Sequence, residues 1–359
     1  MAETSSSGAA AVGMGVGIGS TTLSERLAPA LPPPPPPHPR PVRACIFDLD
    51  GLLINSETLL TEARNATLTE DYSRPPMDAT VKAKLQGRSA QDSTRILYES
   101  ARLVLPADGE EEEVSTSSSS TTTTAVVTIE EFQAKLDNRL RKLFSRTELM
   151  PGVQKLLGNL ARATTATTGG GSGDNKRIEL ALATSSQVAM YNLKTAHLSG
   201  PDGVLSLIPL QHKVLGDDEG LKKGRGKPCP DIFLLALERV NQALRQSRRE
   251  SKENDNEDGI KPEECLVFED AVAGVQAARS AGMRVVWVPE KWLRDMYAGR
   301  EEEVLAGRPT GESMRADGQG GEDVMSMSEA ARAKEWGEIL STLEDFDYSK
   351  YGIVLGGEQ

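Results

Sequence analysis

The sequence has few cysteines and no long apolar run, and both shortages exclude classes of protein. Its three cysteines, Cys45, Cys229 and Cys265, are odd in number and form no C-x-x-C pair. Neither a disulfide framework nor a zinc site is therefore indicated, and a reducing compartment is expected. No run of about 18 apolar residues occurs, so the sequence predicts no membrane-spanning helix.

An excess of positive charge is also missing. The formal net charge is -12 and the isoelectric point is near 5.0, which argue against a general nucleic-acid-binding or membrane-binding surface. A phosphate-binding site in such a protein needs cations of its own. We expect a cytoplasmic protein, with the nucleus or an organelle as alternatives, although the N-terminal segment has few of the arginines typical of targeting peptides.

Two segments have too few apolar residues to form a packed core. Residues 1–42 are rich in Ser, Gly and Pro and contain the run PPPPPP, so they are predicted to be a disordered tail. The proline run makes this tail a candidate ligand for a proline-recognition domain. The acidic and Ser/Thr-rich stretch 106–126 is predicted to be a disordered insertion for the same reason.

Apolar runs bounded by turn residues predict a set of short strands. These strands are 43–47, 178–183, 213–216, 265–268 and 284–288. Helical patterns separate them after residue 150, and strands that alternate with helices predict a doubly wound parallel α/β sheet with helices on both faces. YGIVLG, residues 351–356, is expected to add a last edge strand, whereas 246–260 and 298–330 are expected to lack regular structure.

Between the first strand and residue 150 the pattern is helical, from residue 56 onward. Thr128 with Glu131 forms a capping-box pattern ahead of apolar residues spaced three and four apart, which predicts an amphipathic helix. The helices are therefore expected to form a domain inserted into the α/β core. The expected bounds are 43–54 and 150–359 for the core and 55–149 for the helical domain.

Polar side chains follow the predicted strands at their carboxyl ends. They are Asp48 and Asp50, Thr184 and Ser185, Asp217, and Glu269 and Asp270. In a parallel α/β sheet the ligand lies beyond these ends, so we expect the side chains to converge. Two clusters of carboxylates brought together repel unless a cation lies between them, and hard oxygen ligands suit magnesium. The predicted Mg²⁺ ligands are Asp48, Asp270 and the backbone carbonyl of Asp50.

A phosphoryl group at this edge of the sheet would meet groups suited to its transfer. Asp48 is the predicted nucleophile, which attacks phosphorus and forms an aspartyl-phosphate. Asp50 is the predicted general acid and then general base. Lys227, in a loop before a helix, is predicted to bind the phosphoryl oxygens together with Thr184 and Ser185.

Four motifs in this order resemble the haloacid-dehalogenase-like hydrolase superfamily in its phosphatase branch. They are FDLDG at 47–51, the strand-ending Thr184, GKPCPDIF with Lys227, and FEDAVAG at 268–274. The resemblance covers most of residues 43–290 and implies a Rossmann-like core, a magnesium-dependent phosphotransfer and a supporting role for Glu269. The resemblance also implies that Asp50 marks a phosphotransfer enzyme, since family members that cleave carbon–halogen bonds lack an aspartate there.

The helical insertion resembles the small α-helical cap of the β-phosphoglucomutase and phosphoglycolate phosphatase group. Within it, LQGRSAQDS, which contains Gly87 and Arg88, resembles the cap segment that contacts the substrate. Longer stretches of the core are similar to the pseudouridine 5'-phosphatase group and to relatives that dephosphorylate glycerol phosphate or sugar phosphates. The resemblance leaves the substrate open, because selectivity lies in the cap and this cap carries the insertion at 106–126.

The expected function is hydrolysis of a small phosphorylated metabolite, with pseudouridine 5'-phosphate or a sugar or polyol phosphate as the substrate. A β-phosphoglucomutase-like phosphomutase is the first alternative, since it would share the aspartyl-phosphate but retain it until the product rebinds. An inactive binding or regulatory protein on the same fold is the second. The intact set of Asp48, Asp50, Lys227 and Asp270 argues against inactivity, because such a cluster of charges is costly to keep.

Overall fold

A computed structural model describes residues 40–86, 88, 90–103, 127–166, 176–200, 203–251, 259–308 and 333–356. The chain divides into residues 1–30 and residues 31–359, and all described residues belong to the second unit. The predicted insertion at 106–126 and nearly all of the predicted tail lie outside the described residues. Val42, at the end of that tail, is buried and donates its N–H to the carbonyl of Tyr351.

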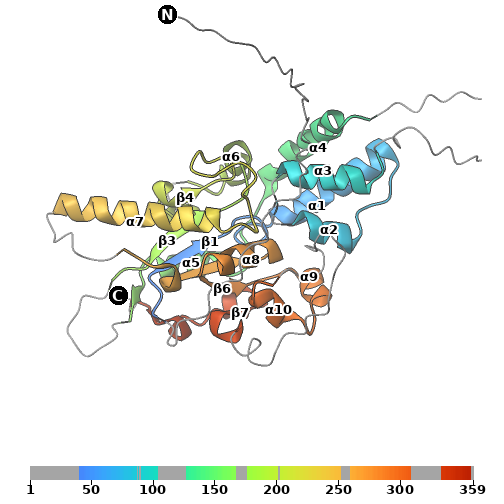
Figure 1. Cartoon of the computed structure of the whole chain (residues 1–359). Helices are drawn as coiled ribbons and strands as arrows, with labels where there is room; N and C mark the ends of the chain where they lie inside the picture. The colour runs from blue at the N-terminus through green and yellow to red at the C-terminus, as the bar shows by residue number, and fades with distance from the viewer. Residues whose placement is uncertain are drawn as a thin grey trace, which may run out of the picture. The chain divides into compact units, whose positions relative to one another are not determined.

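A parallel sheet forms the centre of the described structure (Figure 1). Its strand order is β4-β3-β1-β5-β6-β7, and each strand runs parallel to its neighbours. The strands are β1 (Ala44–Phe47), β3 (Glu179–Ala183), β4 (Lys213–Val214), β5 (Cys265–Glu269), β6 (Arg284–Trp287) and β7 (Gly337–Ile339). The prediction of a doubly wound parallel α/β fold is confirmed.

Both faces of the sheet are covered, which explains why its strands read as continuous apolar runs. Cys45 and Phe47 of β1 pack into one apolar cluster, with α5 (Val153–Leu160) and α6 (Val188–Thr195). Ala44 and Ile46 point to the opposite face and into a second cluster. The helices of that face are α7 (Asp231–Ser251), α8 (Val272–Ser280), α9 (Lys291–Met296) and α10 (Glu301–Leu305).

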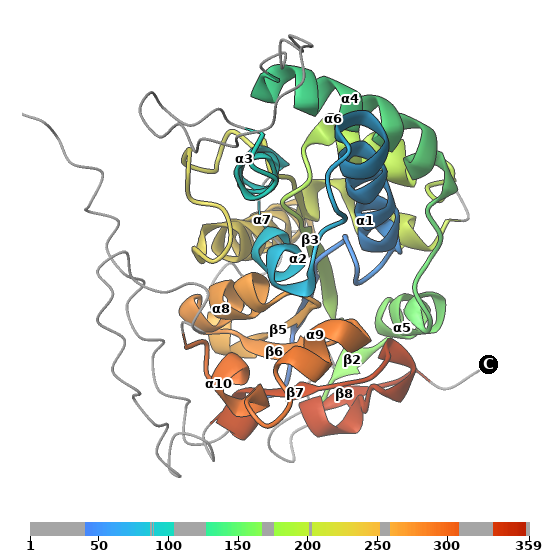
Figure 2. The ribbon, with the colours of Figure 1, turned by 90° about the vertical axis from the view of Figure 1, so that its right-hand side faces the viewer.

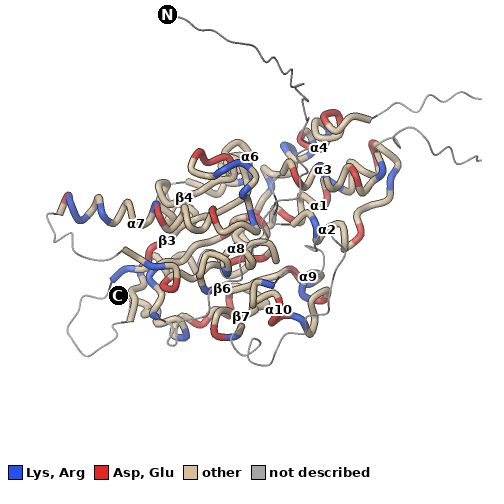
Figure 3. Tube along the Cα trace, viewed as in Figure 1, with Lys and Arg blue, Asp and Glu red and all other residues tan. Residues whose placement is uncertain are grey.

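Three predictions at the edges of the core were wrong in detail. YGIVLG contributes β8 (Ile353–Val354), but β8 pairs antiparallel with β2 (Thr164–Thr165) in a separate sheet, and the described edge strand of the parallel sheet is β7. Helix α7 continues to Ser251, into the tract expected to be irregular. Its outer turns are polar (Figure 3) and carry amide–carboxylate pairs four residues apart, so they show no apolar pattern. Helix α10 also forms within 298–330, where Val304 and Leu305 are buried.

The helices between β1 and residue 150 enclose an apolar cluster of their own. They are α1 (Ser56–Ala66), which continues as a π-helix (Thr67–Asp71), α2 (Ala79–Leu85), α3 (Ala90–Ser100) and α4 (Ile129–Leu143). Their cluster includes Leu59, Leu97, Phe132, Leu136 and Phe144. The four helices lie together beside the sheet (Figure 1), and a view from their side shows them in front of it (Figure 2).

The two chain segments that join these helices to the core run side by side. Ile54 and Leu149 form an antiparallel bridge. Asn55 donates its N–H to the carbonyl of Glu148 at 3.0 Å, and Met150 donates its N–H to the carbonyl of Leu53 at 3.0 Å. Away from these linkers, Lys82 of α2 contacts the core through an ion pair of 2.9 Å with Glu290. No helix in the described part of the chain has the length and apolarity that crossing a bilayer requires.

The capping box predicted at the start of α4 is present. The Thr128 hydroxyl accepts the N–H of Glu131 at 3.2 Å, and the Glu131 carboxylate accepts the N–H of Thr128 at 3.2 Å. These bonds satisfy two N–H groups that the helix leaves without a partner of its own.

We expect Thr128→Ala to lower the free energy of unfolding by about 1 kcal/mol, because the capping bond is lost. Urea denaturation measures this change. Thr69→Ala is the control, since the Thr69 hydroxyl only donates to the carbonyl of Asn65 on an exposed helical surface. An equal effect of both substitutions would contradict a stabilising role for the cap.

Candidate active site

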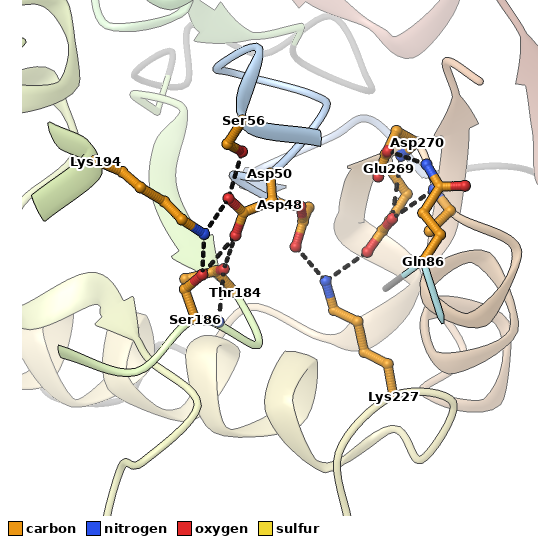
Figure 4. Close-up of polar contacts among 11 residues, drawn as sticks. Asp48, Asp50, Ser56, Gln86, Thr184, Ser186, Lys194, Lys227, Glu269 and Asp270 are labelled. Atoms are coloured by element: carbon orange, nitrogen blue, oxygen red, sulfur yellow. Dashed lines mark hydrogen bonds and ion pairs between the residues drawn. The ribbon is translucent and has the colours of Figure 1, made fainter. Parts of the chain in front are cut away.

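Side chains from three neighbouring strands meet at the carboxyl end of the sheet (Figure 4). Asp48 and Asp50 follow β1, Thr184 follows β3, and Glu269 and Asp270 stand at the end of β5. β1 is the strand between β3 and β5, so its aspartates lie at the centre. The fourth predicted strand end does not contribute in this way: Asp217 accepts the N–H of Val188 at 2.9 Å, near the start of α6.

Lys227 lies between two carboxylates in the buried part of the site. Its Nζ is 2.5 Å from Oδ1 of Asp48 and 2.5 Å from Oε1 of Glu269. Burial alone would lower the pKa of Lys227, but the two carboxylates outweigh it and raise the pKa above its ordinary value. Lys227 is therefore a permanent cation that orients Asp48.

Three carboxylates form a cluster that could hold a divalent cation. Asp48, Glu269 and Asp270 each offer an oxygen within 4.8 Å of the others, and all three are buried. Burial raises the pKa of Asp48 to about 7 in spite of Lys227, and burial together with Glu269 and Asp48 raises the pKa of Asp270 well above its ordinary value. Such mutual repulsion disappears when a cation binds, and oxygen ligands of this type suit Mg²⁺. The cluster contains two of the predicted ligands and adds Glu269.

Asp50 belongs to a second network that faces away from Lys227 (Figure 4). Its carboxylate accepts hydrogen bonds from Ser56 at 2.5 Å, Ser186 at 2.6 Å and Lys194 at 2.6 Å, and a longer one from Thr184 at 3.3 Å. Burial would raise the pKa of Asp50, but the Lys194 ammonium and the hydroxyl donors outweigh it and lower the pKa. Asp50 is held here as a carboxylate, in the form that accepts a proton.

The position of Glu269 depends on a glycine in the next helix. Its Oε2 accepts the N–H groups of Asp270 and Ala271, each at 3.1 Å. The carboxylate then lies against Gly274 of α8, where a Cβ atom would come within 1.8 Å of Oε1 of Glu269. A side chain at position 274 would therefore displace the group that shares Lys227 with Asp48.

A pocket opens between these catalytic candidates and the helices α1 to α4. Asp48, Asp50, Thr184 and Ser185 line it on the side of the core, and Arg88 is among the residues on the opposite side. Arg88 was predicted to contact the substrate, and its place in the pocket wall is compatible with that role. Gly87, predicted with it, lies outside the described residues.

Sequence reasoning missed four residues that contact the site. Three of them, Ser56, Ser186 and Lys194, bind Asp50, and the fourth, Gln86 at the end of α2, donates to Oδ2 of Asp270 at 2.6 Å. Ser186 directly follows the predicted Thr184–Ser185 pair, which was an available signal. Lysine on a helix is normally solvated, so nothing local identifies Lys194.

Comparison with known proteins gives concordant matches. Residues 42–282 match the family of haloacid dehalogenase-like hydrolases. A Saccharomyces cerevisiae protein named as a probable pseudouridine-5'-phosphatase is 31% identical, over 87% of this chain and 98% of its own length. A mitochondrial (DL)-glycerol-3-phosphatase 1 of Arabidopsis thaliana is 33% identical, over 73% of this chain and 68% of its own. A Drosophila melanogaster protein, also named as a probable pseudouridine-5'-phosphatase, is 31% identical over 74% of this chain and 89% of its own.

Gly274→Ala should lower both phosphatase activity and stability, because the new methyl group overlaps Glu269. We expect a loss of about 1–3 kcal/mol in the free energy of unfolding, as for other overpacked sites. Gly158→Ala in α5 is the matched control: a Cβ there meets nothing within 4 Å, so it should be neutral or should stabilise by roughly 0.5–1 kcal/mol. Equal behaviour of the two variants in urea denaturation would contradict the close packing of Glu269.

Mg²⁺ should raise the melting temperature of the wild type and should have little effect on Asp270→Asn. The rise should be larger at pH 8 than at pH 5.5, because protons compete for carboxylates whose pKa values lie above the ordinary range. Without metal, the stability of the protein should change with pH in the opposite direction. The raised pKa of Asp48 means that the folded protein holds a proton which the unfolded chain has released between pH 3.8 and about 7, so stability should fall as the pH rises through 7.

Asp217→Asn serves as the control for this thermal-shift measurement, since its carboxylate bonds to Val188 and lies outside the cluster. A Mg²⁺-induced shift in Asp270→Asn as large as that in the wild type would refute metal binding by this cluster.

Proposed function

We propose that this chain, which belongs to the haloacid dehalogenase-like hydrolase family, is a magnesium-dependent phosphomonoesterase that works through an aspartyl-phosphate at Asp48. The observation that carries this proposal is the pairing of Asp48 with Lys227 at the end of β1, beside two further carboxylates. A buried carboxylate aimed by a permanent cation is a preorganised nucleophile.

In the first step, a carboxylate oxygen of Asp48 attacks phosphorus and the bond from phosphorus to the leaving oxygen breaks. Lys227 keeps Asp48 in place and neutralises charge that develops on the phosphoryl oxygens, with help from the Thr184 hydroxyl and from Ser185. Asp50 gives a proton to the leaving oxygen. Mg²⁺ at the carboxylate cluster would supply further positive charge near the phosphoryl group.

In the second step, water attacks the phosphorus of the aspartyl-phosphate and Asp50 takes the proton of that water. Inorganic phosphate leaves and Asp48 becomes a carboxylate again. The contacts with Ser56, Ser186 and Lys194 favour the ionised Asp50 that this step requires. To act as an acid in the first step, Asp50 must leave these donors and carry a proton.

We assign residues 55–149 to a cap over an active site in the core, which comprises 43–54 and 150–359. The separate apolar cluster of α1 to α4 and the paired linkers at Ile54 and Leu149 support this division. Arg88, and with it Gly87, is assigned to substrate binding because Arg88 lines the pocket above Asp48.

The names of the relatives give pseudouridine 5'-phosphate and glycerol phosphate as candidate substrates, and the resemblance seen in the sequence adds sugar phosphates. A cytoplasmic location and a proline-recognition partner for the tail remain predictions from the sequence, since PPPPPP lies outside the described residues.

The proposal is tested by phosphate release from pseudouridine 5'-phosphate, glycerol phosphates, 2-deoxyglucose 6-phosphate and β-glucose 1-phosphate, with Mg²⁺ or with a chelator. Wild type with Mg²⁺ should turn over at least one substrate, and the chelator should abolish turnover. Asp48→Asn should lose about 1,000-fold or more, because an amide cannot form the phosphoenzyme. Asp50→Asn should lose roughly 100- to 10,000-fold, as expected for loss of general acid–base catalysis.

Asp217→Asn is again the control and should retain activity. Turnover that persists in Asp48→Asn would refute the nucleophile. Conversion of β-glucose 1-phosphate to glucose 6-phosphate that depends on a sugar bisphosphate would identify a mutase instead.

A further inference from the structure

One face of α1 forms part of the wall of the active-site pocket. Glu57, Leu60 and Arg64 all line it, and their spacing of three and seven residues places them on the same side of the helix. The backbone of Arg64 lies about 10 Å further along the helix than that of Glu57, because an α-helix rises about 1.5 Å per residue. Glu57 is close to the reaction centre, since its Cγ would lie 3.0 Å from a Cβ at Gly51.

Arg64 is an unusual residue for this position. Only 5% of its surface is exposed, yet no hydrogen bond or ion pair joins its guanidinium to any residue in the described part of the chain. Burial lowers the pKa of Arg64, and the charge of Glu57 opposes that shift. Buried charged groups are normally paired and hydrogen-bonded, so a guanidinium that reaches a pocket with no hydrogen bond, opposed only by the charge of Glu57, indicates a ligand.

Glu57 shows the same feature with the opposite charge. It is 6% exposed, and its Oε2 is buried without a hydrogen-bond partner among the described residues. The pocket therefore offers an acceptor near the reaction centre and a set of donors further out.

The remaining lining of the pocket restricts the ligand further. Apolar side chains contribute much of the wall: Leu60, Leu85, Leu136, Leu140, Phe144 and Met190. The charges that accompany them balance, since Arg64 and Arg88 are offset by Glu57 and Asp137. A second phosphate or carboxylate would meet carboxylates there, whereas an uncharged ring with polar edges fits both the apolar wall and the hydrogen-bonding capacity left at Arg64 and Glu57.

We propose that Arg64 is the specificity-determining residue of this pocket and donates hydrogen bonds to a carbonyl oxygen of an uncharged, ring-containing leaving group, as in a pyrimidine nucleoside 5'-monophosphate. The inference rests on the proposed phosphatase function and narrows its substrate class. Glu57 accepts a hydroxyl of the part of the ligand that joins the ring to the phosphate. A leaving group of three carbons, as in glycerol phosphate, has no ring and no carbonyl oxygen to accept from the guanidinium, so glycerol phosphate does not use this residue.

The test compares kcat/KM of the wild type and Arg64→Met for pseudouridine 5'-phosphate, uridine 5'-phosphate and glycerol 3-phosphate. Loss of hydrogen bonds to a bound carbonyl should lower kcat/KM for at least one of the two nucleotides by about 10- to 100-fold, and glycerol 3-phosphate turnover should stay within about threefold. Arg139→Met is the matched control. Arg139 is a cationic residue of the same helical group that pairs with Glu70 and Asp71 and does not line the pocket. Its substitution should leave the ratios of kcat/KM among the three substrates unchanged.

Two further measurements separate recognition from structure. Calorimetric binding of the same nucleotide to Asp48→Asn should weaken by a similar factor when Arg64→Met is added, since the loss is in binding. The melting temperature of Arg64→Met without ligand should fall little, because the buried cation that is removed has no hydrogen bond and interacts only with the charge of Glu57. A lower melting temperature with equal losses for all three substrates would assign Arg64 a structural role and overturn the inference.

The possible failures are distinguishable. If the wild type hydrolyses glycerol 3-phosphate but neither nucleotide, or if Arg64→Met leaves nucleotide turnover intact, the inference is wrong and the phosphatase stands. If the wild type releases phosphate neither from these three substrates nor from any member of the wider panel, the proposed function is wrong and the inference is lost with it.

Discussion

The packing of like charges at the carboxyl ends of β1 and β5 is the constraint on which the rest of the site depends. Asp48, Glu269 and Asp270 are closer together than buried carboxylates can remain without compensation. Lys227 compensates two of them directly. Glu269 also accepts two N–H groups at the start of α8, Gln86 donates to Asp270, and the cluster is suited to bind a cation that would offset the remaining charge.

The two aspartates that follow β1 are close in the sequence, but their surroundings shift their pKa values in opposite directions. Asp48 faces Lys227 but is pushed toward the protonated form by burial and by other carboxylates, and its pKa rises. Asp50 faces Lys194 with hydroxyl donors, and its pKa falls. Below pH 7 these shifts favour a protonated Asp48 and an ionised Asp50, so this arrangement must be reversed before the first step, whereas the second step uses the ionised Asp50 directly.

The sequence predicted those features that are local or that repeat along the chain. Apolar runs identified β1, β3 and β5, and the residues that follow them supplied Asp48, Thr184 and Asp270. The capping box fixed the start of α4. Lys194 and Gln86 were missed because each reaches the site only through tertiary packing. The sequence pattern of each helix does not indicate which site residue the side chain will contact. Strands of two or three residues, such as β2 and β7, carry too few positions to show a period, and the strand predicted at 351–356 gave no sign that it would pair outside the parallel sheet.

The pairing of the two linkers limits how the helical group can move. Ile54 and Leu149 are bridged, and the backbone bonds on either side tie both connections into one short ribbon. Because both connections are tied to each other at this point, α1 to α4 would move as one group relative to the core and not on two independent linkers. Such a movement away from the core would break the ion pair between Lys82 and Glu290, which joins α2 to the core outside the linkers.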